Sequence, residues 1–480
     1  MTHFLQSLTL GLILLMTTSN SPGAHSNNSK KVVVIGAGIA GLTTAHRLYQ
    51  QEIDVDLYEA RERAGGRIFS AILNDKIVEL GGHNLSDGGE AVNILKLVQE
   101  FNLELETANI LLDHHFLNES EFLSANKLLK DKNYNPETLR QQLDHFASQA
   151  ANMKEVLDQF LSEQEPLYKL LAVRLAAFEG ASLEQLSSHY IVTLYHLLLG
   201  GTCLAHQGNS EGDSYLELTH IKNGNAFLPE KIAKTLGSRV HLNMPLQEMA
   251  VNKNGEYQLT FTNNETIKAD IVVLAIPCSV FSDIKFTENC IPKEQLELIR
   301  SVPYGTNAKL ILPFSTPPDK RVLINEQVIC YYDPRCSVST VYFTGKSSCF
   351  SQANIAHCYS QARTLLESGS ENVCPPFTLP QYALDKNFLS YTIPIGYSWP
   401  CDPYVKGSYS YVPPGLEEWL RTTIELDGIT YKKLFNPIAN TLYFAGEHAS
   451  ILLDAPGTIE AACESGERVA KAILGSLNCP

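Results

Sequence analysis

The sequence predicts an α/β protein in which a doubly wound domain around a parallel sheet is assembled from separated segments of the chain. Three observations support this fold class. Residues 31–35, 42–50 and 54–58 have the patterns of a strand, a helix and a second strand, which together form a βαβ unit. Buried strands are predicted again much later, at 268–277 and 441–446. The composition changes between these strands, so a second domain is expected to be inserted there.

The intervening segments predict an α+β substrate domain with a helical insertion. Leu, Ala and Gln recur at helical spacing from about 90 to 199, whereas 304–314 and 388–411 are strand-like and rich in aromatic residues. The predicted divisions, in chain order, are a signal peptide at 1–25, a first cofactor-binding segment at 31–89, a helical insertion at 90–215, a second cofactor-binding segment at 216–300, the sheet of the substrate domain at 301–430 and a third cofactor-binding segment at 431–478.

Composition restricts the class of partner. The 480 residues are 44% hydrophobic and 19% charged, as in ordinary globular proteins. A formal net charge of −15 argues against nucleic-acid binding, because phosphate recognition needs a basic surface. The acidity favours the approach of small cations, although solubility alone also explains it.

The N-terminus predicts export. The first 25 residues contain no Asp, Glu, Lys or Arg, and Phe4 to Met16 form an apolar run that is too short to span a bilayer. Cleavage is expected after Ala24. With no second long apolar run, a periplasmic or secreted protein without a stable membrane span is expected.

The cysteines are consistent with an oxidising compartment. The chain has 11 of them, and six crowd into one region: Cys330, Cys336, Cys349, Cys358, Cys374 and Cys401. Disulfides are expected there, with the pairing left open and buried thiols as the alternative. No Cys or His spacing is typical of a zinc site, so no metal is predicted.

The GAGIAG stretch at 36–41 predicts a dinucleotide site. Gly36 permits a tight turn, Gly38 lets the backbone approach a pyrophosphate, and Gly41 allows the helix to pack closely. The following helix, with Ile39 and Ala40 in its first turn, offers N–H groups to the phosphates. Glu59, at the end of the next strand, is placed to bind a ribose.

A longer cofactor than NAD is indicated by the residues that follow. Glu59 is followed in the sequence by further arginines and glycine pairs. A domain that binds only a nicotinamide cofactor has no need of them. FAD does, because its ribityl and isoalloxazine groups extend beyond the pyrophosphate. These expected cofactor residues are Ala60, Arg61, Gly65, Gly66, Arg67, Gly81, Gly82, His83 and Asn84.

With these motifs the sequence resembles the flavin-containing amine oxidase family, which includes monoamine, polyamine and L-amino acid oxidases. The resemblance extends over nearly all of 31–475 and is strong at both ends, whereas the helical middle matches nothing specific. It implies a Rossmann-like, glutathione-reductase-like FAD-binding domain. It also implies late cofactor contacts from Leu246, Ala275, Pro277, Gly446, Glu447, Gly457, Thr458 and Ile459. For Glu447, a surface position after a strand is the alternative.

The resemblance also implies residues at the reacting face. Lys309 stands where the family has a lysine that bonds through water to the flavin N5, and Tyr409 matches one wall of an aromatic cage. Trp399 lies in the segment that passes in front of the flavin, and Thr458 stands in place of a second cage tyrosine. The alternatives are a solvent-facing lysine on an edge strand and core packing for Trp399.

Departures from the family pattern restrict the expected chemistry. Ser408 replaces the cysteine that attaches flavin covalently in monoamine oxidases, so non-covalent FAD is expected. Asn84 stands about where L-amino acid oxidases have an arginine for the substrate carboxylate, which favours an amine without one. His83 is expected to line the site, with a structural histidine as the alternative.

The reaction implied is oxidation of a small amine by hydride transfer to the flavin, with oxygen as acceptor, giving an aldehyde and hydrogen peroxide. Two other functions stay open. One is an FAD enzyme like protoporphyrinogen oxidase or carotenoid desaturase, and the other is a secreted flavoprotein without catalysis. An NAD-dependent dehydrogenase is disfavoured by Arg67 and the Glu447 segment.

Overall fold

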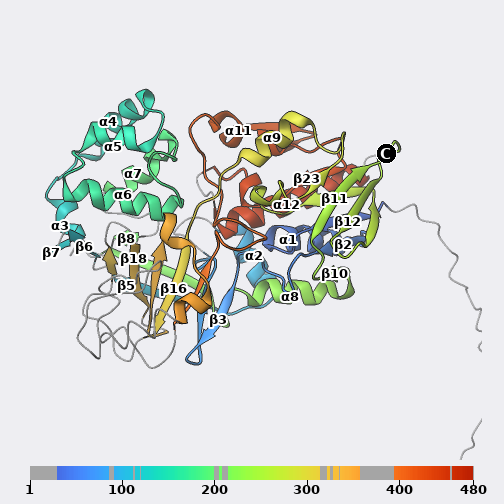
Figure 1. The fold of residues 1–480 in the computed structure, drawn as a ribbon, viewed down its shortest axis with the longest axis horizontal. Coiled ribbons are helices and arrows are strands. Elements are labelled where there is room, and N and C mark those ends of the chain that lie inside the picture. Colours follow the sequence, from blue (N-terminus) through green and yellow to red (C-terminus); the bar gives the residue numbers. More distant parts are fainter. Residues whose placement is uncertain are drawn as a thin grey trace, which may run out of the picture.

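The protein is described here by a computed structural model with two lobes, the parallel-sheet domain on the right of Figure 1 and the second domain on the left. The residues described are 30–85, 91–111, 114–118, 121–198, 205–207, 214–313, 322–324, 328–333, 336–356, 394–453 and 457–478. The predicted signal peptide at 1–25, Cys358 and Cys374 lie outside these ranges.

The first domain is organised around a parallel sheet in the order β10-β2-β1-β14-β23. Its strands come from distant parts of the chain: β1 (Val32–Ile35), β2 (Val55–Tyr58), β10 (Val240–His241), β14 (Ile271–Leu274) and β23 (Leu442–Phe444). Every residue of β1 and β14 is buried, as expected for central strands of a parallel sheet covered on both faces. The prediction of an α/β fold with a parallel sheet is confirmed.

Helices and a smaller sheet surround these strands. Helix α1 packs against both α12 and α8, and α2 packs against α12. The helices are α1 (Ile39–Tyr49), α2 (Val92–Glu100), α8 (Phe227–Leu236) and α12 (Ile459–Asn478). A second sheet of this domain has the order β13-β12-β11-β15; its strands are β11 (Leu246–Val251), β12 (Tyr257–Phe261), β13 (Thr266–Ala269) and β15 (Lys285–Phe286). A hairpin of β3 (Ser70–Leu73) and β4 (Lys76–Glu79) completes the domain.

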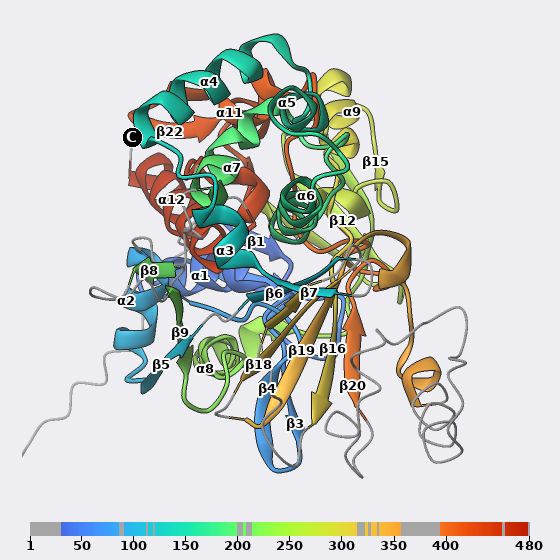
Figure 2. The same cartoon turned by 90° about the vertical axis from the view of Figure 1, so that its left-hand side faces the viewer.

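The second domain places helices over a mixed sheet in the order β20-β16-β19-β18-β17-β6-β7. The strands are β6 (His114–Asn118), β7 (Glu121–Ser124), β16 (Ala308–Pro313), β17 (Val322–Ile324), β18 (Val328–Asp333), β19 (Val338–Phe343) and β20 (Ile395–Ser398). Figures 1 and 2 show helices gathered above this sheet, namely α4 (Pro136–Gln149), α5 (Met153–Phe160), α6 (Pro166–Glu179) and α7 (Ile191–Leu198); α3 (Ala125–Lys130) joins them to β7.

The remaining elements connect the two domains or extend their edges. They are α9 (Lys293–Ser301), α11 (Glu417–Arg421), β21 (Thr423–Leu426) and β22 (Ile429–Lys432), with short 3₁₀ turns that include η1 (Ser188–Tyr190) and η7 (Glu447–Ala449).

The helical insertion expected at 90–215 contains strands as well as helices. Besides its helices, this region contains β6 and β7, β5 (Leu105–Leu111), β8 (Ala205–Gln207) and the start of β9 (Ser214–Ile221). Strand β5 pairs with β9, more than one hundred residues later, and β6 pairs with β17. Helical periodicity is a local signal, whereas these pairings are long-range, so the composition of the region concealed its strands.

The strand predicted at 268–277 is in fact two strands in different sheets. Strand β13 ends at Ala269 and β14 begins at Ile271. Between them Asp270 accepts a hydrogen bond from the Lys31 backbone N–H at 2.7 Å, which fixes the crossing point next to the start of β1. In the strand-like stretch 388–411, the strand in the described residues is β20, and the chain continues from it in turns.

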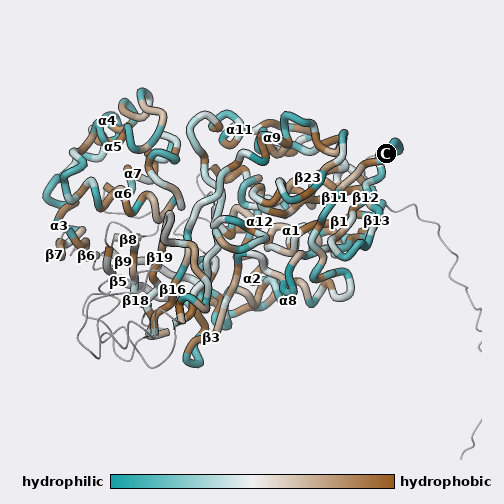
Figure 3. Tube along the Cα trace, viewed as in Figure 1, coloured by the Kyte–Doolittle hydropathy of each residue, from teal (hydrophilic) through white to brown (hydrophobic). Residues whose placement is uncertain are grey.

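Hydrophobic residues are concentrated inside both domains. Figure 3 shows brown segments along the central elements of the parallel-sheet domain and along α6, with teal at the tip of the β3 hairpin. Leu170, Leu171 and Leu175 of α6 are fully buried. Of the described helices, none combines the length and the apolar composition that a membrane crossing requires.

One disulfide joins Cys349 to Cys401 within the described residues, with a Cα–Cα distance of 5.7 Å. It fixes the turn that follows β20, where Trp399 and Asp402 are buried. Cys278, Cys290, Cys330 and Cys463 are buried thiols. The expectation of a disulfide in the crowded region is therefore met, with a pairing that the sequence had left open.

Replacing Cys349 and Cys401 together by Ser should lower stability by about 4 kcal/mol, because a cross-link over a sequence separation of 52 residues restricts the unfolded chain to that extent. Thermal unfolding of the wild type and the double variant, with and without a reductant, measures this difference. The reductant should lower the melting temperature of the wild type and leave that of the double variant unchanged. Equal melting temperatures would show that the cross-link adds no stability.

Candidate functional site

A cavity of about 970 Å³ extends from the parallel sheet into the second domain. Its walls come from all three predicted cofactor segments, from α6 and from the second-domain sheet. Of the predicted site residues, those that line it are Gly36, Gly38, Ile39, Ala40, Glu59, Ala60, Arg61, Gly65, Gly66, Arg67, Gly81, Gly82, His83, Asn84, Leu246, Ala275, Pro277, Lys309, Trp399, Tyr409, Gly446, Glu447, Gly457, Thr458 and Ile459.

The glycine turn between β1 and α1 forms one end of the cavity. Gly36 has φ +103°, and a Cβ there would lie 2.5 Å from the Ala275 carbonyl oxygen, so the position requires glycine. Gly41 lies behind the turn and does not line the cavity. It contacts the turn closely, since a Cβ at that position would lie 2.0 Å from Gly36 O. Its role in the structure is close packing of the helix.

The start of α1 is suited to an anion. No side chain caps this helix, so its first N–H groups remain available to a ligand. A Cβ at Gly38 would have no heavy atom within 4 Å, which leaves its face of the turn open to the cavity. Gly65 pairs with Gly38 in an isolated bridge and closes the turn from the other side.

Glu59 is held at the end of β2 by backbone donors. Its carboxylate accepts hydrogen bonds from the N–H of Ala37 at 2.7 Å and of Arg61 at 2.9 Å, and the residue is buried. The Arg61 guanidinium is paired with Asp402, which also accepts a hydrogen bond from Tyr397. In this structure Arg61 therefore ties the first cofactor segment to the turn after β20.

The partly buried Arg67 and the buried Glu447 form an ion pair in the cavity wall, with 2.9 Å between Nη1 and Oε1. Arg67 also donates to the Ser408 carbonyl at 2.8 Å, and Glu447 accepts a hydrogen bond from Ser410 Oγ at 2.6 Å. Burial alone would raise the pKa of Glu447, but the Arg67 charge and the Ser410 hydrogen bond hold it below its usual value. The surface alternative for Glu447 is wrong.

Lys309 lies on β16, a strand paired on both sides. Only 3% of the residue is exposed, so the alternative of a solvent-facing edge lysine is wrong. Its Nζ donates to the carbonyls of Gly81 at 2.6 Å and Glu79 at 3.3 Å, and lies 5.6 Å from the centre of the Tyr342 ring. Burial lowers the pKa of Lys309 to about 8, against the opposing effect of the Glu79 carboxylate.

Tyr409 forms a wall of the cavity beside Gly457. A Cβ at Gly457 would lie 2.8 Å from Tyr409 Cδ2, so the glycine makes room for the ring. The Tyr409 hydroxyl donates to the carbonyl of Phe178 at 2.6 Å, which attaches this wall to the end of α6. Thr458 lies next in the chain and also lines the cavity.

Trp399 both lines the cavity and packs in the core. It is 5% exposed, and its indole N–H donates to the Leu80 carbonyl at 3.1 Å. A place in the cavity wall and packing in the core, the two interpretations of Trp399, are therefore both met by this one buried side chain.

The end of α6 supplies a carboxylate that the sequence did not single out. Helix α6 ends at Gly180, whose φ of +77° is the left-handed conformation favoured at helix C-termini. The preceding residue, Glu179, lines the cavity and accepts a hydrogen bond from Thr193 Oγ1 at 2.8 Å. Removal from solvent raises the pKa of Glu179 to about 7, although the Thr193 hydrogen bond opposes the shift.

Aromatic side chains complete this part of the cavity. Tyr190, Tyr331 and Tyr342 line it together with Tyr409, and burial raises the pKa of Tyr342 to about 12. In the sequence these tyrosines are scattered through strands and turns that also suit core packing. Only their positions around Glu179 and Lys309 in the folded chain distinguish these tyrosines from tyrosines of the core.

The cavity fits FAD by two observations on its own residues. The uncapped start of α1 and the buried Glu59 form a pyrophosphate and ribose site. Beyond them, Asn84 Oδ1 is buried and has no hydrogen-bond partner among the described residues, so a bound group is needed to satisfy it. The Arg67–Glu447 pair and the segment from Gly81 to Asn84 would then hold the portion of FAD beyond the pyrophosphate.

Solved structures of amine oxidases have the same fold. Cyclohexylamine oxidase from Brevibacterium oxydans aligns with a TM-score of 0.69 and 19% identity, over 94% of this chain and 99% of that one. A putrescine oxidase bound to putrescine aligns with a TM-score of 0.67 and 17% identity, over 93% and 99% of the two chains.

Sequence comparison extends over the same length. Flavin-containing amine oxidase B of Bos taurus is 26% identical over 93% of this chain and 86% of its own length, and amine oxidase A of the same species is 24% identical over 93% and 85%. The family model for flavin containing amine oxidoreductases matches residues 39–349 and 395–474. With most of its length matched, the chain belongs to the flavin containing amine oxidoreductase family.

Proposed function

We propose that this protein is an FAD-dependent amine oxidase that acts on an amine without a carboxylate, with oxygen as the electron acceptor. The observation that carries the proposal is the buried Lys309, hydrogen-bonded to the Gly81 segment of the cofactor site and facing a cavity walled by tyrosines. A buried lysine is costly unless its position serves the site.

A bound flavin would supply the redox chemistry, with the hydride of the amine α-carbon as the electron source and oxygen, reduced to hydrogen peroxide, as the final acceptor. Hydrolysis of the resulting imine would give an aldehyde and ammonia. The tyrosine walls would orient the amine and exclude water. Lys309 uses two of its N–H groups on backbone carbonyls, and its third hydrogen-bonding position would hold a water beside the reacting atoms.

The proposal includes non-covalent FAD. Ser408 stands where a covalent link would need a cysteine thiol, and its hydroxyl donates to Asn307 Oδ1 at 2.8 Å. The side chain is therefore engaged within the protein.

We also propose export to the periplasm or medium. The uncharged apolar run at 4–16 and the Cys349–Cys401 disulfide support it, because disulfides persist in oxidising compartments.

The direct test of this function is the visible spectrum of the purified protein before and after amines are added without oxygen. The oxidised flavin should be released intact on denaturation and should be bleached by a primary amine, and readmission of oxygen should restore it with formation of peroxide. Bleaching by a porphyrinogen or a polyene, but by no amine, would favour the alternative FAD enzymes. Bleaching by none of them would favour a flavoprotein without catalysis.

Lys309→Met should slow turnover by at least tenfold while FAD stays bound, because the variant retains an apolar chain and loses the group that holds the water. Stopped-flow absorbance of flavin reduction and reoxidation measures the two half-reactions separately. Lys293→Met is the matched control, since its side chain is 90% exposed in the described structure. Normal rates in both half-reactions would remove Lys309 from the mechanism.

Glu179→Gln should raise KM for a cationic amine about tenfold, since a hydrogen bond between charged partners contributes about 1.5 kcal/mol. The pKa of about 7 also predicts a pH dependence. As pH rises through 7 the wild-type carboxylate ionises and amine affinity should increase, whereas Gln cannot ionise and should lack this increase.

Steady-state kinetics from pH 6 to 8 tests both expectations, with the exposed Glu184 changed to Gln as control. If Glu179→Gln has the wild-type KM and the wild-type pH profile, Glu179 does not contact the substrate.

A further inference from the structure

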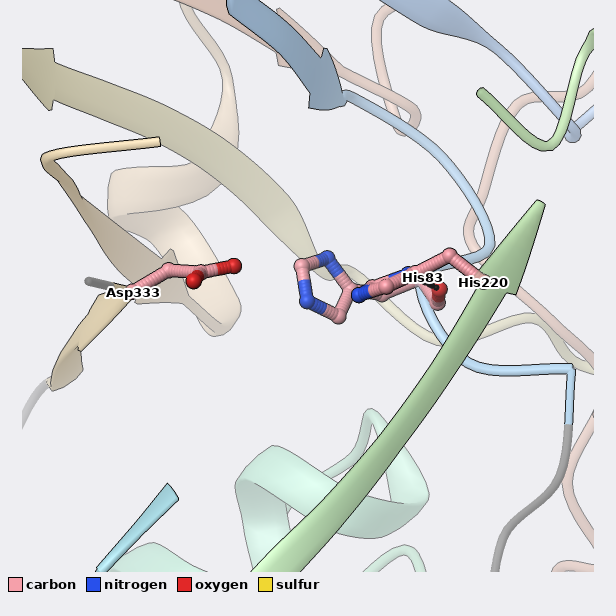
Figure 4. Close-up of side chains that lie close together, drawn as sticks. All are labelled: His83, His220 and Asp333. Carbon is pink, nitrogen blue, oxygen red and sulfur yellow. Dashed lines mark hydrogen bonds between the residues drawn. The ribbon is translucent and has the colours of Figure 1, made fainter. Parts of the chain in front are cut away.

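Three potential metal ligands meet beside the large cavity, and the amine oxidase proposal gives no role to two of them, His220 and Asp333. His83 follows the Gly81–Gly82 pair, His220 lies near the end of β9, and Asp333 is the last residue of β18. One ligand atom from each lies within 4.8 Å of the others. Figure 4 shows the Asp333 carboxylate directed towards two neighbouring imidazole rings.

Two of the three residues of the cluster are buried. Asp333 is 3% exposed and His220 is 7% exposed. A separate cavity of about 50 Å³ lies against all three residues, and Cys336 and Thr340 also line it. That volume is sufficient for a cation with one water, since a water occupies about 30 Å³.

His220 is already oriented as a metal ligand. Its Nδ1 lies 2.7 Å from the His83 carbonyl oxygen, which can only accept, so Nδ1 carries a proton and Nε2 is the ring nitrogen that can bind a metal. Metal-binding histidines are usually fixed in this way, through a hydrogen bond from the second ring nitrogen to a carbonyl or carboxylate.

The backbone that carries His83 is fixed as well. Asn225 Nδ2 donates to the carbonyls of His83 at 2.9 Å and Gly82 at 3.1 Å. The backbone from which the second imidazole extends is therefore held by the segment between β9 and α8.

We propose that His83, His220 and Asp333 form a binding site for a divalent transition-metal cation, with zinc as the representative ion. Two imidazoles and a carboxylate are a common zinc donor set, and a water would complete a tetrahedron. In tetrahedral zinc sites the ligand atoms lie about 3.3 Å apart, so side-chain rotation must bring these atoms closer by up to about 1.5 Å.

The location gives the ion a positioning role. His83 also lines the large cavity, and the neighbouring carbonyls of Gly81 and Glu79 hold Lys309. A cation on His83 would therefore fix the segment from 79 to 83, on which the Lys309 ammonium depends, without entering the redox step.

The test measures zinc binding by the flavin-loaded protein. After removal of metals with a chelator, equilibrium dialysis against zinc and elemental analysis should find one ion per chain. His220→Gln and Asp333→Asn should each weaken binding at least hundredfold, because each removes a donor while keeping a similar volume. His145→Gln, on the exposed face of α4, should bind like the wild type.

Cobalt provides a readout that needs no variant. Co²⁺ bound to the wild type by two imidazoles and a carboxylate should give d–d absorption bands beyond the flavin absorption, and zinc should displace them. A wild type that binds no zinc overturns the proposal, as does equal binding by the wild type and both ligand variants. Failure of amine turnover with zinc binding intact would overturn the proposed oxidase function and leave this site standing.

Discussion

The ion pair between the partly buried Arg67 and the buried Glu447 is the contact on which the arrangement of the site depends. Withdrawing two charges from water costs several kcal/mol for each ion, and the cost is offset only where the partners and additional hydrogen bonds are correctly placed. Here the additional partners are Ser408 and Ser410. The pair therefore requires the first cofactor segment, the segment after β20 and the final segment to meet at one point, although more than three hundred residues separate the first segment from the other two.

This requirement places the proposed substrate site beside the proposed cofactor site. Ser408 and Ser410 flank Tyr409, so the residues that complete the ion pair also position the tyrosine wall. The Tyr409 hydroxyl binds the backbone of α6 next to Glu179, which brings a carboxylate from the helical region into the same cavity. Lys309 approaches from the other side, bound to the Gly81 backbone. In the proposed function, specificity would thus arise from the second domain and cofactor binding from the first.

The sequence predicted the parts of the site that are formed by residues close together in the chain. The glycine turn, the ribose carboxylate and the late Gly446–Glu447 turn are contiguous motifs, and each has a recognisable residue order. The pattern did not identify Glu179, because a glutamate at the end of an amphipathic helix is ordinarily solvated. Nor did it identify the cluster of His83, His220 and Asp333, since no short spacing connects residues so far apart. The strands inside 90–215 were missed for the same reason, as β5 is stabilised by β9 and not by its own neighbours.

The sequence by itself determined the α/β class, the order of the cofactor segments and the family to which the chain belongs. These features follow from backbone requirements that act within a few residues, such as the positive φ of Gly36 and the continuous burial of β1. Only the tertiary structure decided which side chains share a cavity and which charges are neutralised. Burial and electrostatic pairing depend on distance in space, and folding brings Arg67 to Glu447, Lys309 to Gly81 and Asp333 to His220.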